Sequence, residues 1–369
     1  MYKIIEVSSD TNIGGAGKCL LTLLSEFDRD RFEVKTILPR NSLLKKDIEA
    51  LGVQVIEVDG IADKSLDMGA VGELRRIFKR EKPDLVHTHA SMSARIAARL
   101  AGTKIVYTRH SVFPQPKKLT TIPGKWINGA VNNFLSDGII AVAEAAKENL
   151  TETGVSPKKI TVILNGVDGL KRVTEEEQAQ IRKRFGVQEN ELVISIIARL
   201  EDIKGHEYFI DAAHELLKSG IKAKFMIAGT GSYEETLKTR VHDKGLEKDV
   251  IFTGFISDVD KLLNITDLQV NASYGTEATS LALLEGMSLG IPAVVSDFGG
   301  NPGVIQSGVN GLVVPKCDTK ALYDGILKIV RDPALYQKLS EGALEQFHKT
   351  FTAEAMTKNT QKLYEKIIR

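Results

Sequence analysis

The 369-residue chain has little of several features that define whole classes of protein. Its two cysteines, Cys19 and Cys317, are far apart in sequence and predict neither a disulfide framework nor a zinc site. No run approaches the roughly 18 consecutive apolar residues that a membrane-spanning helix needs. The first residues enter a strand-like segment directly and show no export signal. We therefore expect a protein of the reducing cytoplasm.

Strong charge of one sign is also missing, because the formal net charge is +1. The protein therefore lacks the strong overall positive charge of a typical nucleic-acid-binding protein, and we expect no nucleic acid partner. The distribution is uneven, since residues 1–165 contain 24 Lys or Arg against 19 Asp or Glu. No acidic residue lies between Asp84 and Asp137. This basic window indicates either an ordinary solvated face or attraction for anionic substrates or an anionic membrane surface.

What the chain does contain is a regular alternation of short β-branched runs with helix-length amphipathic segments. This rhythm predicts parallel sheets with helices on both faces, and it is interrupted by a polar stretch near residues 166–190. We predict an α/β fold of two Rossmann-like, doubly wound domains facing across a cleft. The first holds residues 1–166 and is joined by a C-terminal helix, 352–369; the second holds 167–351. The predicted strands are 3–9, 33–38, 53–58, 84–88, 104–108, 138–142, 160–164, 192–198, 222–228, 250–253, 268–271, 293–296 and 311–314.

Ligands of such folds bind where loops leave the carboxyl ends of strands, so chemistry is expected there. The loop after the first predicted strand holds Gly14 and Gly15 before a helix, which suits the close approach of an anion. It matches neither a P-loop nor a GxGxxG fingerprint, and a turn that only packs helix on strand is the alternative. His110 closes another strand. His87 and His89 have strand spacing; without a nearby carboxylate or thiol they make a weak metal site, so a supporting role is expected.

Two cations, Arg199 and Lys204, follow the first predicted strand of the second domain. They lie five positions apart and bracket a short loop and the start of a helix, so they can converge on one anion. A diphosphate matches a planar guanidinium fork beside a compact ammonium. The alternative is a pair of solvated loop cations.

Two carboxylates, Glu277 and Glu285, lie eight positions apart. Thr279 or Ser280 is a suitable N-cap for a helix over 281–289, whose first amides can hold phosphate oxygens. Glu285 falls inside this otherwise apolar helix, where an unpartnered carboxylate is costly, and the two hydroxyls of a ribose would satisfy it. Glu277 lies in the preceding loop, nearer the reacting end of a nucleotide-linked substrate. A salt-bridged helix Glu with an unrelated loop Glu is the alternative.

Together these motifs resemble the retaining glycosyltransferases of the GT-B fold in family 4, also called glycosyl transferases group 1. The resemblance covers nearly the whole chain. Members carry two Glu separated by seven residues, an Arg and a Lys after the first strand of the second domain, a Gly-Gly loop after strand one, and a His after a first-domain strand. The matching residues here are Glu277 and Glu285, Arg199 and Lys204, Gly14 and Gly15, and His110.

The resemblance implies metal-independent transfer of a hexose-type sugar from a nucleoside diphosphate donor to an acceptor hydroxyl, with retention and without a cofactor. UDP is the most frequent nucleotide in the family, and GDP and ADP stay open. The second domain would hold most of the donor and the first domain the acceptor. The implied contacts are Glu285 with the ribose, Arg199 and Lys204 with the leaving diphosphate, Glu277 and His110 with the sugar, Thr279, Ser280 and Leu281 with the phosphates, and Ile256 with the base.

The chain departs from the family pattern in two places. Many members have Phe-Gly where this chain has Thr279 and Ser280. Many have Gly-Gly-x-Pro-Glu where this chain ends the motif with Gly303, which puts a conventional role for that position in doubt. Neither departure touches the predicted diphosphate contacts.

Other functions and the acceptor stay open at this stage. A nucleotide-sugar epimerase shares the two-Rossmann shape, and a non-catalytic sugar-binding module is a second alternative; the absent GxGxxG argues against a nicotinamide-dependent dehydrogenase. The acceptor is a glycan, a glycolipid or a small molecule, as in synthesis of cell-envelope polysaccharide. Residues 114–136 combine Lys117, Lys118, Lys125 and Trp126 with apolar residues. They predict an acceptor lid, a patch on the anionic inner face of the membrane, or an ordinary packed helix.

Overall fold

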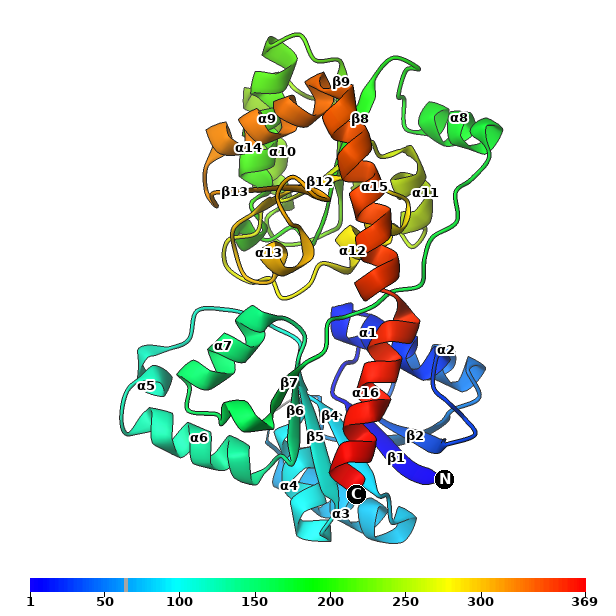
Figure 1. The fold of residues 1–369 in the computed structure, drawn as a ribbon, viewed down its shortest axis with the longest axis vertical. Coiled ribbons are helices and arrows are strands. Elements are labelled where there is room, and N and C mark those ends of the chain that lie inside the picture. Colours follow the sequence, from blue (N-terminus) through cyan, green and yellow to red (C-terminus); the bar gives the residue numbers. More distant parts are fainter. Residues whose placement is uncertain (63–65) are drawn as a thin grey trace. The chain divides into compact units, whose positions relative to one another are not determined.

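The computed structural model describes residues 1–62 and 66–369, which form two compact units. Unit 1 contains 1–167 and 352–369, and unit 2 contains 168–351. Each unit is built on one parallel sheet with helices on both faces (Figure 1). Within the part of the chain that is described, no helix combines the length and apolar character needed to cross a bilayer.

Unit 1 has a seven-stranded sheet in the order β3-β2-β1-β4-β5-β6-β7. Its strands are β1 (Tyr2–Ser8), β2 (Phe32–Pro39), β3 (Gln54–Val58), β4 (Leu85–His89), β5 (Lys104–Arg109), β6 (Gly138–Ala141) and β7 (Ile160–Val162). Its helices are α1 (Gly15–Ser25), α2 (Leu44–Ala50), α3 (Met68–Glu81), α4 (Met92–Ala101), α5 (Lys117–Thr120), α6 (Gly124–Phe134), α7 (Glu144–Glu152), the 3₁₀ turn η1 (Pro157–Lys159) and α16 (Ala353–Ile368).

Unit 2 has a six-stranded sheet in the order β10-β9-β8-β11-β12-β13. Its strands are β8 (Leu192–Ile197), β9 (Ala223–Ala228), β10 (Val250–Gly254), β11 (Leu268–Asn271), β12 (Ala293–Ser296) and β13 (Gly311–Val314). Its helices are α8 (Glu175–Arg184), η2 (Asp202–Lys204), α9 (His206–Lys218), α10 (Glu234–Asp243), α11 (Val259–Ile265), α12 (Leu281–Ser288), α13 (Asn301–Val304), α14 (Thr319–Arg331) and α15 (Pro333–Thr350).

The two-residue period of the strands decides which helices each side chain meets. In β1, Ile4 packs in a buried cluster with α1, α2 and α16, whereas its neighbour Ile5 packs in a separate cluster with α3 and α4. The same alternation sorts Leu85 from Val86 in β4 and orders β5. Polar residues whose side chains point to the same side of the sheet as Ile4 therefore lie on the face that α16 covers.

The predicted strand–helix alternation is confirmed along the chain. Three strands, 268–271, 293–296 and 311–314, have the predicted bounds, and each of the others differs by one or two residues at one end or at both. Helix starts follow local capping chemistry: Thr174 and Glu177 form a capping box for α8, and Asp67, Ser91 and Asp318 accept from amides in the first turn of α3, α4 and α14. The structure thus places the loops after β1, β4, β5, β8 and β11 at the carboxyl edges of their sheets.

Candidate active site

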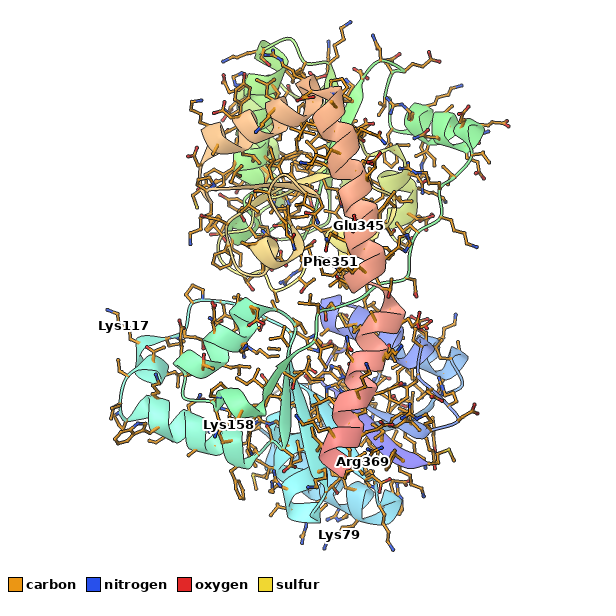
Figure 2. All side chains as sticks on the ribbon, viewed as in Figure 1. Lys79, Lys117, Lys158, Glu345, Phe351 and Arg369 are labelled. Carbon is orange, nitrogen blue, oxygen red and sulfur yellow. The ribbon has the colours of Figure 1, made fainter. Side chains whose placement is uncertain are left out.

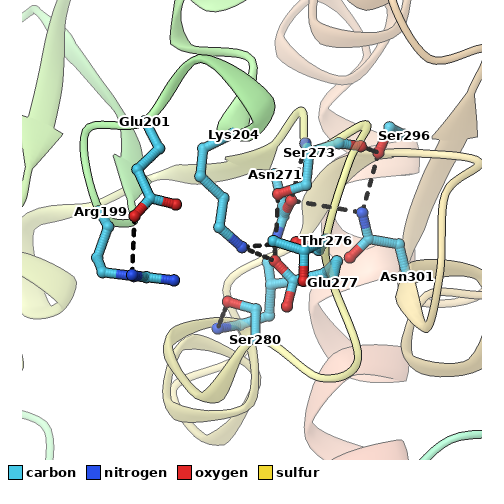
Figure 3. Close-up of polar contacts among 11 residues, drawn as sticks. Arg199, Glu201, Lys204, Asn271, Ser273, Thr276, Glu277, Ser280, Ser296 and Asn301 are labelled. Atoms are coloured by element: carbon cyan, nitrogen blue, oxygen red, sulfur yellow. Dashed lines mark hydrogen bonds and ion pairs between the residues drawn. The ribbon is translucent and has the colours of Figure 1, made fainter. Parts of the chain in front are cut away.

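The centre of the candidate site in unit 2 is Glu277, in the loop between β11 and α12. Its side chain is buried, and its Oε2 accepts from Lys204 Nζ at 3.0 Å, Asn271 Nδ2 at 3.1 Å and Ser273 Oγ at 3.2 Å (Figure 3). One oxygen of this carboxylate is therefore fixed by three donors of unit 2.

A second layer of polar side chains fixes Asn271, and with it Glu277. Asn301 Nδ2 donates to Ser296 Oγ at 3.0 Å, and Ser296 Oγ donates to the carbonyl of Ser273 at 2.5 Å (Figure 3). The backbone N–H of Ser273 donates to Asn271 Oδ1 at 3.1 Å. Hydrogen bonds of this kind hold a functional carboxylate in one orientation.

Two glycines bring the surrounding loops close to Glu277. Gly299 has a φ of +61°, and a Cβ there would lie 2.1 Å from the carbonyl oxygen of Glu277. Gly205 has a φ of +72°, and a Cβ there would lie 2.2 Å from the carbonyl oxygen of Ala272. Both positions combine a left-handed backbone with a contact that only glycine permits. By contrast, a Cβ at Gly303 would meet nothing within 4 Å, so internal packing does not require glycine there.

Lys204 ends η2 and points from the loop after β8 toward Glu277 (Figure 3). Its Nζ donates to the carbonyl of Thr276 at 2.8 Å and to Glu277 Oε2 at 3.0 Å, and the side chain is 12% exposed. An ammonium has three N–H donors, and two have partners among the described residues. The third can meet an anionic ligand.

Arg199 stands apart from this arrangement. Its guanidinium is 70% exposed and forms an ion pair with Glu201 at 2.8 Å (Figure 3). Arg199 and Lys204 share no partner among the described residues. The structure therefore brings together the predicted residues Lys204 and Glu277 and leaves Arg199 beside them with a carboxylate of its own.

Helix α12 begins where the sequence predicts. Ser280 is its N-cap, and its side chain accepts from the Leu283 N–H at 3.4 Å, so Ser280 rather than Thr279 takes the capping role. Leu281 is the first residue of the helix, and its amide lies in the turn where anions are favoured. Glu285 is half-buried, between the buried residues Leu284 and Gly286.

The other residues predicted to bind substrate are less buried than Glu277. Ile256 is half-buried and packs against a cluster that includes Val193 and Met226. Gly14 caps the start of α1, and Gly15 is its first residue; both are exposed. A Cβ on either glycine would meet nothing within 4 Å, so the alternative reading, glycines kept to pack helix on strand, finds no contact there.

Unit 1 holds a buried polar cluster on the α16 face of its sheet. Glu6 has no exposed surface, and its carboxylate accepts from Tyr364 Oη at 2.8 Å and lies 3.1 Å from His89 Nε2, its hydrogen-bond partner. His87 Nδ1 lies 2.9 Å from the same carboxylate and 2.6 Å from Tyr364 Oη. His87 Nε2 lies 2.6 Å from Thr108 Oγ1. The period of the strands places these residues on one face, because Glu6 pairs with His87 across β1 and β4.

His110 joins this cluster through His89, whose Nδ1 lies 2.8 Å from His110 Nε2. Burial opposes ionisation of Glu6, but His87 and His89 outweigh it and lower the pKa of Glu6 to about 2. In the His89 tautomer that donates Nε2–H to Glu6, Nδ1 accepts from His110 Nε2–H. Burial, with His89 and His87, also holds the pKa of His110 well below its usual value. His110 is therefore neutral, with a lone pair on Nδ1.

The prediction that His87 and His89 lack a nearby carboxylate was wrong, because β1 supplies Glu6. The ligand atoms of these three residues lie within 4.8 Å of one another, close enough to surround a metal ion. Each already has a hydrogen-bond partner within the cluster. The cluster is organised as a hydrogen-bond network that fixes His110.

Several of these residues were not predicted from the sequence. Glu6 interrupts the apolar strand β1 just as Glu285 interrupts α12, so the reasoning applied to Glu285 would have found it. Tyr364 lies 358 positions from Glu6, and no local pattern links the two. The roles of Asn271, Ser273 and Asn301 beside Glu277 depend on how the loops of unit 2 fold, so only the structure reveals them.

Family models match both halves of the chain. The model for Glycosyltransferase Family 4 matches residues 13–169, and the model for Glycosyl transferases group 1 matches residues 177–346. The UDP-Gal:alpha-D-GlcNAc-diphosphoundecaprenol alpha-1,3-galactosyltransferase of Escherichia coli is 30% identical over 279 residues, which are 73% of this chain and 72% of that protein. The N-acetyl-alpha-D-glucosaminyl L-malate synthase of Bacillus anthracis is 25% identical over 315 residues, 82% of this chain and 80% of that protein.

Solved structures share the whole fold. HepE of Anabaena in complex with UDP matches with a TM-score of 0.85 and 21% identity, covering 99% of this chain and 100% of that one. A glycosyltransferase of Rickettsia africae matches with a TM-score of 0.85 and 20% identity, covering 100% of this chain and 99% of that one. The chain therefore belongs to the group 1 glycosyltransferases of family 4, and it has the GT-B fold that the sequence motifs predict.

Proposed function

We propose that this glycosyltransferase moves a sugar from a UDP-sugar to an acceptor hydroxyl, with retention of the anomeric configuration. The observation that carries the proposal is the Lys204 ammonium, which is held by Thr276 and Glu277 beside the first turn of α12 and keeps one N–H for a ligand. A cation and helix amides at the carboxyl edge of a parallel sheet suit a diphosphate. Uridine is favoured because the Escherichia coli relative is named for UDP-Gal and HepE was solved with UDP.

In this mechanism the charge on the departing diphosphate grows as the glycosidic bond breaks. Lys204 and the amides that follow Ser280 stabilise that charge, so they bind the transition state more tightly than the ground state. Arg199 joins them by exchanging Glu201 for a phosphate oxygen. The cationic groups of the chain supply the charge stabilisation, and we propose that the reaction needs no metal ion.

The sugar and nucleoside contacts follow from the same arrangement. Oε1 of Glu277 accepts from sugar hydroxyls, while Oε2 stays with Lys204. Glu285 binds the ribose hydroxyls, and Ile256 lies near the base. Gly14 and Gly15 let the backbone approach the substrate closely, because no side chain occupies the space beyond them. Nδ1 of His110 accepts from a substrate hydroxyl and faces the positive charge that develops at the anomeric carbon.

We assign the donor to unit 2 and the acceptor to unit 1. The reaction proceeds on one face of the sugar, and the leaving phosphate takes the proton of the acceptor hydroxyl. The acceptor is a sugar linked to a lipid diphosphate, because the Escherichia coli relative is named for such a compound and covers most of the chain. We assign the activity to synthesis of cell-envelope polysaccharide.

The proposal is tested by adding UDP-, GDP- and ADP-sugars in a thermal-shift screen and then assaying transfer with the donor that binds. Proton NMR of the product measures the anomeric configuration. We expect a UDP-sugar to raise the melting temperature of the protein. We also expect the new glycosidic bond to have the same anomeric configuration as the donor. Turnover of the UDP-sugar without an acceptor would indicate an epimerase instead, and binding of free sugar with no response to UDP would indicate a sugar-binding module.

A specific feature of α6 also supports contact with an anionic membrane. The inner face of α6 is polar, since Asn128 donates to the carbonyl of Thr153 at 2.8 Å and Asn133 accepts from the Ser156 N–H at 2.9 Å. Its outer face is apolar: Trp126, Ile127 and Phe134 are 67%, 62% and 66% exposed. This reverses the usual amphipathic arrangement of a surface helix. With Lys117 and Lys118 on the neighbouring α5, the outer face suits the interface of an anionic bilayer.

Co-sedimentation with vesicles measures this contact. We expect binding to phosphatidylglycerol vesicles, weaker binding to phosphatidylcholine, and loss of binding in the variant Lys117→Glu, Lys118→Glu. A matched control is Lys79→Glu, Lys82→Glu at the end of α3; Figure 2 shows Lys79 and Lys117 well apart on unit 1. Equal binding of both variants would remove α5 and α6 from the contact.

A further inference from the structure

Unit 1 contains a second polar site, on the face of the sheet opposite the histidine cluster. A pocket of about 280 Å³ lies at the carboxyl ends of β4 and β5 and is bordered by α4, α6, α7 and the segment that leads into α5. Its polar lining consists mainly of two guanidinium groups and four carboxamides, and none of its described lining residues is acidic. These residues are Arg95, Arg109, Gln115, Asn128, Asn132 and Asn149.

Arg95 is a buried cation whose partners are all neutral. Its side chain is 3% exposed, and it donates to Asn132 Oδ1 at 3.0 Å, Ser136 Oγ at 2.9 Å and the carbonyl of Leu135 at 3.3 Å. Its guanidinium lies 4.6 Å from the ring centre of Tyr107. Within residues 1–62 and 66–369 it forms no ion pair. A buried charge is normally balanced by an opposite charge, so this arrangement leaves a positive field in the pocket.

The neighbouring arginine on α4 shows the usual solution. Arg99, one turn after Arg95, donates to both carboxylate oxygens of Asp137 at 3.3 Å. The helix therefore carries one balanced and one unbalanced arginine. The unbalanced one is the one that lines the pocket.

Arg109 adds a second cation to the same pocket. Its Nε donates to the carbonyl of Ser111 at 3.1 Å, and its guanidinium lies 4.6 Å from the ring centre of Phe113. Like Arg95, it forms no ion pair with any residue that the structure describes. These contacts fix the plane of the guanidinium and leave its terminal nitrogens for a ligand, which is the geometry that oxyanions need.

We propose that this pocket binds a phosphate or diphosphate group, and that this group belongs to the acceptor. Two fixed guanidinium groups balance about two negative charges, and the carboxamide N–H donors of the lining can meet further oxygens. Helix α6 provides Asn128 and Asn132 to the pocket and turns Trp126 and Ile127 to the outside. A phosphate head with an apolar tail matches both faces of this helix. The identity of the ligand as the acceptor rests on the proposed function; the binding of the anion does not.

The test measures pyrophosphate binding by calorimetry to the full chain, with UDP present in excess to occupy the proposed donor site. The variant is Arg109→Gln, which removes a half-exposed cation without opening the core. The control is Lys104→Gln, an exposed cation at the opposite end of the same strand, outside the pocket. We expect the affinity for pyrophosphate to fall about 10-fold or more in Arg109→Gln, since the variant removes charge-assisted hydrogen bonds to the anion. Lys104→Gln should match the wild type.

A second arm identifies the source of the phosphate group. Phosphatidylcholine vesicles with and without a polyprenyl phosphate replace pyrophosphate, and Arg109→Gln is again compared with Lys104→Gln. Selective loss of binding to the polyprenyl phosphate vesicles supports a lipid-borne group; selective loss for free pyrophosphate alone supports a soluble one. Equal affinities of wild type and Arg109→Gln in both arms overturn the proposal, even if UDP-sugar transfer is demonstrated. Failure of UDP to bind affects the proposed function and leaves the pyrophosphate result readable.

Discussion

The chain contains two cationic sites that differ in how their charge is balanced. In unit 2, Lys204 is paired with Glu277 at 3.0 Å, so the site is close to neutral before a ligand binds. In unit 1, Arg95 and Arg109 line a pocket without a carboxylate partner among the described residues. A balanced site can hold a carboxylate in place and respond to charge that develops during a reaction. An unbalanced site suits a ligand that carries its negative charge from the start.

The variant expected to have the largest effect removes the balanced cation. Lys204→Ala should lower kcat/KM for transfer by about 10²–10³-fold, since it removes a donor aimed at the leaving group. It also leaves the Glu277 carboxylate buried without its cation, so the free energy of unfolding should fall by ~3 kcal/mol. Denaturant unfolding and transfer assays measure both.

A double variant separates these two effects. Lys204→Ala with Glu277→Gln restores neutrality, so we expect stability to recover while activity stays low. Lys222→Ala, an exposed lysine of unit 2, is the control and should leave both unchanged. Recovery of activity in the double variant would contradict a role for Lys204 in the reaction.

The next prediction crosses the two sites kinetically. Arg109→Gln should raise the KM for a phosphate-bearing acceptor about 10-fold and leave the KM for the UDP-sugar unchanged. Lys204→Ala should affect the donor and leave acceptor affinity near the wild-type value. If both variants change the same parameter, the assignment of one substrate to each unit is wrong.

Acid should destabilise unit 1 through its histidine cluster. Burial lowers the pKa of His87 and of His110 in the folded unit. As the pH falls below about 6.5, these histidines bind protons in the unfolded chain but stay neutral in the folded unit. Each such histidine reduces the free energy of unfolding by up to ~1.4 kcal/mol per pH unit as the pH falls below about 6.5. Glu6, with a pKa of about 2, adds an effect of the same sign below about pH 4.5, while burial raises the pKa of Asp10 and opposes it there.

Urea unfolding across this pH range measures the slope. The variant His87→Gln keeps a hydrogen-bonding side chain but cannot take up the proton, so its slope should be shallower than that of the wild type. A slope that His87→Gln leaves unchanged would mean that His87 is already protonated in the folded unit.

The smallest predicted effect concerns the glycine loop of unit 1. Gly14→Ala should leave the free energy of unfolding within about 0.5 kcal/mol of the wild type, because a Cβ there meets nothing. Transfer should fall roughly tenfold if a substrate approaches this loop closely. Gly17→Ala is the contrasting variant, because its Cβ would lie 2.9 Å from Leu44 Cδ2, so the buried Leu44 side chain must shift. Unchanged transfer in Gly14→Ala would leave the loop without a binding role.

The sequence predicted the fold well because period and capping are local properties. The strand runs of β11, β12 and β13 and the cap at Ser280 depend on neighbouring residues alone, and the structure confirms them. The sequence predicted that Lys204 and Glu277 belong to one site, but not that they form an ion pair. They lie 73 positions apart and meet because the loops after β8 and β11, two adjacent strands, lie side by side.

Other features depend on partners that no local pattern reveals. The periodicity of α6 is the same whether its apolar stripe faces inward or outward, and the loops that bind Asn128 and Asn133 decide the outcome. Nothing in the sequence distinguishes Arg95 from Arg99, but in the structure Arg99 pairs with Asp137 and Arg95 does not. The two-residue period of β5 also separates Arg109, its last residue, from His110, which follows it. Arg109 lines the pocket with Arg95, and His110 contacts the histidine cluster.

The central claim is that the Lys204 ammonium binds the diphosphate of the donor. Calorimetric titration of UDP and of uridine into wild type and Lys204→Ala isolates this contact, because only UDP carries the phosphates. We predict that the wild type prefers UDP over uridine and that Lys204→Ala loses at least about 10-fold of that preference, while Lys222→Ala keeps it. The same preference in Lys204→Ala and wild type would contradict the account.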